Sequence, residues 1–124
     1  MAIHTETAIY KAALDLTRLS SQLVAQMPRN HRAVDGALLV GNSRALLKHV
    51  RRANMATDKI PHIDALLERL ADLQTDLRVC TDLRLITQRN FSKAAALSIS
   101  VGKQAGGWKK KSASRPDSWS SRQS

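Results

Sequence analysis

The stretch IDALLERLADLQTDLRVC, residues 63–80, carries the most regular apolar pattern in the chain. Its apolar residues alternate three and four positions apart, and they are Ile63, Leu66, Leu70, Leu73, Leu77 and Cys80. This spacing places them along one face of an α-helix and is typical of the seam between helices that cross at a shallow angle. The stretch therefore predicts one helix of a helical bundle.

Apolar residues recur at helical spacing in three further segments, so the sequence predicts four helices, at about residues 7–26, 30–55, 61–85 and 88–105. Asn30 and Thr87 are expected to cap the second and fourth helices, and Pro61 suits the first turn of the third. Outside residues 63–80, the expected core positions are Ile9, Ala12, Leu16, Leu19, Leu23, Val34, Leu38, Ala45, Leu46, Phe91, Ala94, Ala95, Val101 and Ala105. With short connections between the helices, this pattern favours an all-α, antiparallel, up-down-up-down four-helix bundle.

The bundle is expected to occupy residues 1–108 and to be followed by a disordered tail. Residues 109–124, KKKSASRPDSWSSRQS, are basic and contain six serines, with no apolar period that could bury enough surface to offset ordering. Gly106 and Gly107 are expected just past the last helical turn, where glycine adopts a left-handed conformation without strain. Trp108 is then expected to fold back over the end of the bundle.

Composition indicates an anionic partner. The 124 residues include 20 Lys and Arg against 10 Asp and Glu, a formal charge of +10 that favours nucleic acid first and a membrane surface second. No apolar run approaches the roughly 18 residues of a membrane span, and the N-terminus lacks the layout of a signal peptide. With Cys80 as the single cysteine, we expect a cytoplasmic protein with no intrachain disulfide and no membrane role.

Charged residues gather on particular helix faces. The residues expected to contact the phosphates of RNA or DNA are Arg44, Lys48, Arg51, Arg52, Arg89, Lys93 and Lys103, with Lys109, Lys110 and Lys111 as an electrostatic tether. Like charges four residues apart repel on a helix, so their repetition without intervening acids favours a phosphate partner over a merely soluble surface. An acidic stripe of Asp64, Glu68, Asp72 and Asp76 is either a solvated face or an interface with a subunit or partner.

Catalytic, metal-binding and cofactor-binding patterns are not evident. The histidines are spread over several elements without the spacing of metal ligands; they are His4, His31, His49 and His62. The carboxylates have no His, Ser or Lys beside them in a recognisable catalytic arrangement, and no Gly-rich phosphate loop follows a strand. The sequence predicts a protein that is not an enzyme and that holds no metal or cofactor.

Three motifs together resemble a known family: PRNHR at 28–32, LRVCTDLRLIT at 77–87 and GKQAGGWKK at 102–110. They are similar to motifs of the four-helix-bundle family that includes the accessory variability determinant (Avd) proteins of diversity-generating retroelements. The same family includes proteins encoded in intervening sequences of bacterial 23S rRNA genes. The resemblance spans about residues 8–111 and adds Arg78 to the expected nucleic-acid contacts, although Gln74 stands where relatives often carry an Arg.

The resemblance implies a barrel-like homopentamer that binds nucleic acid and a reverse transcriptase, with no known chemistry of its own. Such a complex copies an RNA template with errors at adenine and returns the cDNA to a variable gene. Two alternatives stay open. One is a structural assembly module for protein partners, like the intervening-sequence proteins, with no nucleic-acid role. The other, a membrane-surface protein, is less favoured because the Leu-rich helices suit a shared core.

Overall fold

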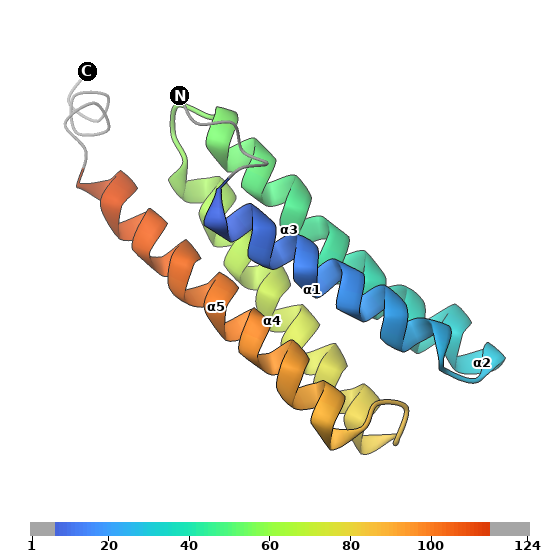
Figure 1. Ribbon diagram of the computed structural model, residues 1–124. Coiled ribbons are helices and arrows are strands. Elements are labelled where there is room, and N and C mark those ends of the chain that lie inside the picture. The colour runs from blue at the N-terminus through green and yellow to red at the C-terminus, as the bar shows by residue number, and fades with distance from the viewer. Residues whose placement is uncertain (1–6, 115–124) are drawn as a thin grey trace.

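The computed structural model describes residues 7–114, and within them it is all-helical, without a strand. Four long helical segments lie side by side (Figure 1). They are α1 (Ala8–Ala25); a continuous run of α2 (Arg29–His31), the π-helical segment η2 (Arg32–Gly36) and α3 (Ala37–Met55); α4 (Ile60–Asp82); and α5 (Gln88–Ala113). The predicted all-α fold of four helices packed as a bundle is confirmed for this part of the chain.

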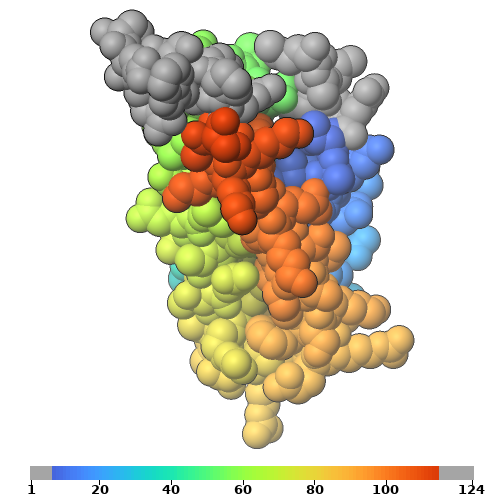
Figure 2. All heavy atoms as spheres, turned by 90° about the vertical axis from the view of Figure 1, so that its left-hand side faces the viewer, coloured from blue at the N-terminus to red at the C-terminus, as the bar shows by residue number. Residues whose placement is uncertain are grey.

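The four long helices form a ring in which each packs against two neighbours. Helix α3 packs on α1 and α4, and α5 packs on the same two helices. Figure 2 shows the face on which α4 and α5 lie next to each other. As a result α3 and α5, the two helices richest in basic residues, occupy opposite corners of the bundle.

Every long helix contributes a seam of buried residues spaced alternately three and four apart. All six seam residues predicted in residues 63–80 are at most 4% exposed. In the other helices the seam also uses small polar residues, among them Ser43 and Ser98. Their hydroxyls donate to the carbonyl oxygens of Leu39 (2.6 Å) and Ala95 (2.8 Å), so burial does not leave these donors unpaired.

The second long helix begins differently from the prediction. Its first residue is Arg29, with Pro28 rather than Asn30 at the N-cap position. Val34 and Leu38, expected in the core, are 61% and 56% exposed. A π-helical turn holds one more residue than an α-helical turn, so η2 shifts the buried face to Gly36 and its successors.

Helix α4 ends three residues before the predicted boundary at residue 85. The amide of Leu85 donates to the carbonyl of Cys80 (2.8 Å), and the amide of Arg84 donates to that of Thr81 (2.9 Å). These two bonds form a Schellman motif, whose left-handed position is occupied here by Arg84 (φ 62°) instead of the usual glycine. Thr87 then caps α5 as predicted, its hydroxyl accepting from the amide of Asn90 (3.1 Å).

Helix α5 continues well beyond the predicted end at residue 105, so the expected glycine cap is wrong. Gly106 and Gly107 lie inside the helix, and no glycine in residues 7–114 has a positive φ. Trp108 is also helical and packs half-buried against the core instead of folding back. The disordered tail predicted from residue 109 is wrong for 109–113, and its residues 115–124 lie outside the described range.

Candidate nucleic-acid interface

The most concentrated basic surface lies on α3. Arg44, Lys48, Arg51 and Arg52 are all exposed. At about 100° per residue, they fall within an arc of about 100° around the helix. None of them forms an ion pair with any residue of the described range. This face therefore presents four uncompensated positive charges to solvent.

A second basic surface runs along α5, where Arg89, Lys93 and Lys103 are exposed as expected. Because the helix continues to Ala113, Lys110 and Lys111 extend this surface as part of the helix and do not form a loose tether. The Nζ atom of Lys109 instead lies 2.7 Å from an Asp64 carboxylate oxygen on α4. Lys109 thus ties α5 to α4, and its charge is compensated within the chain.

The two basic surfaces are separated in space because α3 and α5 are at opposite corners of the ring. Between them, on α4, the Arg78 guanidinium carbon lies 5.2 Å from the ring centroid of Phe91, a cation–π arrangement that covers this half-buried aromatic ring. Gln74 donates to the hydroxyl of Ser98 at 3.3 Å and so links α4 to α5. The predicted basic residues therefore form separate surfaces and not one continuous patch.

The acidic stripe does not run straight along α4. Four-residue steps advance about 40° beyond a full turn each, so three steps rotate the stripe by roughly a third of the circumference. Accordingly Asp64 reaches Lys109 of α5 at one end, and Asp76 accepts a hydrogen bond from the Asn42 amide of α3 at the other. Only Glu68 and Asp72 remain exposed without a partner in the described range.

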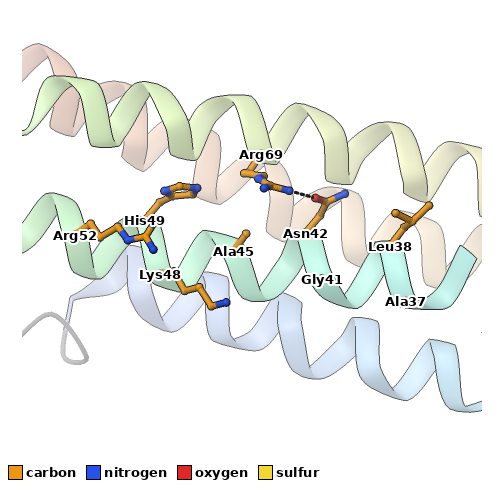
Figure 3. Close-up of a pocket in the computed structure, with 9 residues that line it drawn as sticks. All are labelled: Ala37, Leu38, Gly41, Asn42, Ala45, Lys48, His49, Arg52 and Arg69. Carbon is orange, nitrogen blue, oxygen red and sulfur yellow. Dashed lines mark hydrogen bonds between the residues drawn. The ribbon is translucent and has the colours of Figure 1, made fainter. Parts of the chain in front are cut away.

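An open groove of about 360 Å³ runs between α3 and α4 (Figure 3), and two of its polar residues, Asn42 and Arg69, were not among the residues predicted from the sequence. Lys48, His49 and Arg52 line it from α3, and Arg69 lines it from α4. The Nη1 atom of Arg69 donates to the Asn42 side-chain oxygen at 2.9 Å. No local signal in the sequence joins Arg69 to the basic residues of α3, because only helix packing brings them together.

His49 lies among the positive charges of this groove, and its pKa is lowered there. Burial lowers its pKa from the ordinary value of 6.5, and the charges of Arg52, Arg69 and His62 lower it further. Its Nδ1 atom is buried without a hydrogen-bond partner among the described residues. The side chain is therefore held mainly neutral at pH 7 beside several cations.

Cys80 does not have the environment of a reactive thiolate. Burial raises the pKa of its thiol to about 11, and the carboxylates of Asp35 and Asp76 act in the same direction. In residues 7–114 there is also no group of three or more His, Cys, Asp or Glu residues placed to hold a metal ion. Cys80 is a small core residue in the α4 seam, as its apolar register predicted.

No helix in the described part of the chain is both long enough and apolar enough to cross a membrane. Comparison of the sequence and structure with protein-family models, curated proteins and solved structures finds no match.

Proposed function

We propose that this chain is a noncatalytic, cytoplasmic accessory protein that binds the phosphate backbone of RNA or DNA and partners the reverse transcriptase of a diversity-generating retroelement. The observation that carries the nucleic-acid part is the α3 surface of Arg44, Lys48, Arg51 and Arg52. These four exposed cations have no acidic partner in residues 7–114. A polyanion relieves their mutual repulsion and releases its own counterions, which makes binding favourable and dependent on salt.

Backbone recognition fits this surface better than base recognition. Recognition of the bases of a single strand relies on exposed aromatic rings that stack on them. The Phe91 ring is half-buried beneath Arg78, and Tyr10 packs against the core. Lys and Arg contacts to phosphate fix position without reading sequence, so we expect weak sequence preference.

The retroelement part rests on the three motifs that resemble the Avd family. In the structure, PRNHR begins the second long helix, and LRVCTDLRLIT spans the end of α4 up to the cap of α5. The third motif, GKQAGGWKK, was expected to end the fourth helix, but it lies within α5 and does not end it. We propose the family's assembly as well, an antiparallel up-down-up-down bundle arranged as a homopentamer.

The test is RNA and duplex-DNA binding across a salt series, with the mass in solution recorded for each protein. Arg51→Glu/Arg52→Glu is compared with Lys11→Glu/Arg18→Glu, which makes the same charge change on exposed residues of α1. Each phosphate contact contributes about 0.9 to the slope of log affinity against log salt for duplex DNA. We expect the α3 variant to lose roughly two contacts, or about 1.8 in slope, and the α1 variant to keep the slope. Equal losses in both variants, with native helicity, would remove the assignment to α3.

A second candidate function, an assembly module for protein partners, is favoured by one observation. Val34 and Leu38 of the second long helix are exposed, as are Val79 and Leu83 near the end of α4. Exposed apolar side chains of this size suit a protein interface. Partner binding that does not change with salt, in a protein that binds no nucleic acid, would support this function instead.

A further inference from the structure

The groove between α3 and α4 has one cationic end and one apolar end. Lys48, His49 and Arg52 line the first end, and Arg69 reaches the middle of the groove from α4, beside Asn42 (Figure 3). Leu38, Gly41 and Ala45 line the second, and Figure 3 shows them following one another along α3. A cation cluster beside an apolar floor suits a ligand that carries both a phosphate and an apolar face, as a nucleotide unit does.

Arg69 is held in place before any ligand arrives. Its Nη1 atom donates to the side-chain oxygen of Asn42 (2.9 Å), and the Asn42 amide in turn donates to Asp76 (Figure 3 shows the first bond). A guanidinium has five N–H donors in a fixed fork, so one bond to Asn42 orients the group and leaves other donors for an anion. Asp76 is the carboxylate connected to this network, and its oxygen is engaged by Asn42.

The apolar end is open because residue 41 has no side chain. A Cβ atom built on Gly41 would meet no atom within 4 Å. The groove volume of about 360 Å³ is also many times the roughly 30 Å³ that one water molecule takes up in the liquid. A sugar or base can therefore lie over Gly41 without displacing protein atoms.

We propose that this groove is a nucleotide subsite, in which Lys48, Arg52 and Arg69 hold one backbone phosphate beside His49 while the sugar or base lies over Leu38, Gly41 and Ala45. The inference rests on the proposed nucleic-acid function. It adds to that function a specific binding position for one nucleotide and the uptake of a proton by His49 on binding. The coupling follows from His49, whose pKa is lowered by burial and by the charges of Arg52, Arg69 and His62. A bound phosphate offsets those charges, so it raises the pKa of His49 and binding takes up a proton.

The experiment follows the imidazole resonances of the full chain by NMR during pH titrations, alone, with inorganic phosphate and with single-stranded RNA. His31 is the internal control, because its Nδ1 atom lies 2.8 Å from Asp35 on the segment that precedes α3. We expect RNA to raise the pKa of His49 and to leave the His31 resonances unperturbed. RNA affinity should accordingly increase as the pH falls toward 6.

The matched variants are Gly41→Leu, which fills the groove, and Gly106→Leu, which adds the same side chain at an equally open position on α5. Gly41→Leu should lower the slope of log affinity against log salt by about 0.7, the share of one single-strand phosphate contact. It should also abolish the response of His49, whereas Gly106→Leu should change neither quantity.

The outcomes separate the two proposals. RNA binding that leaves His49 unmoved and tolerates Gly41→Leu overturns the subsite and leaves the proposed function standing. A shift of His49 with inorganic phosphate in a protein that binds no RNA overturns both the proposed function and the nucleotide assignment, since the groove then takes a free anion.

Discussion

Replacing Gly106 and Gly107 with alanine tests whether these residues are helical or end the helix in the left-handed conformation. The two conformations predict changes of opposite sign in the free energy of unfolding. In the structure both glycines are helical, exposed and surrounded by open space, and a Cβ atom at either position meets nothing within 4 Å. Glycine costs about 0.8–1.0 kcal/mol relative to alanine in a helix interior. Because these residues lie near the C-terminal end of α5, where helices fray, we expect the pair to gain about 1–2 kcal/mol.

The measurement is urea unfolding followed by circular dichroism, together with the thermal midpoint. For a chain of this size, about 1–2 kcal/mol corresponds to a rise in Tm of roughly 3–10 °C. If the glycines instead ended the helix in the left-handed conformation, each alanine would cost about 1–2 kcal/mol and the variant would be destabilised. A fall in the denaturant midpoint at an unchanged m value would therefore refute the helical assignment of residues 106 and 107.

Three further predictions concern single positions. Arg84→Gly should stabilise the fold by about 1 kcal/mol in the same unfolding assay, because a non-glycine residue at φ 62° is strained, while Arg84→Ala, which retains the strain, should not. Gly36→Ala should destabilise it, because the new Cβ would lie 2.5 Å from a Val24 methyl carbon and overpacking costs about 1–3 kcal/mol. In a Val24→Ala background the same change should become stabilising, and a loss of equal size there would contradict the steric explanation. Cys80, whose pKa is raised to about 11 by burial and by Asp35 and Asp76, should stay protonated and resist a thiol reagent at pH 8 until the protein unfolds; fast labelling of the native protein would contradict this.

The candidate site was only partly predictable from the sequence. The α3 surface could be found because helical periodicity alone decides that Arg44, Lys48 and Arg51 share a face. The groove could not be predicted, because Arg69 lines it from another helix. In the sequence Arg69 is a single basic residue within an acidic stretch. Nor does the local sequence show that Lys109 is compensated by Asp64, a contact between α5 and α4.

The sequence by itself determined the features that depend on near neighbours. The seam from Ile63 to Cys80, the hydroxyl cap at Thr87 and the position of Pro61 in the first turn of α4 all follow from spacing and side-chain chemistry within a few residues. The all-α class followed from four such patterns. These features are set by the local backbone geometry of a helix, whatever it later packs against.

Only the tertiary structure decided which helices face one another and how far each one extends. The contact of Gly36 with Val24, the burial of Ser43 and Ser98 in the seams, and the continuation of α5 through Gly107 involve residues far apart in the chain or packing around a whole helix. Glycine permits both a helical and a left-handed conformation, so its own preference cannot select between them. Packing of α5 against α1 and α4 supplies the free energy that selects the helical conformation. The same packing places the basic helices α3 and α5 at opposite corners of the bundle.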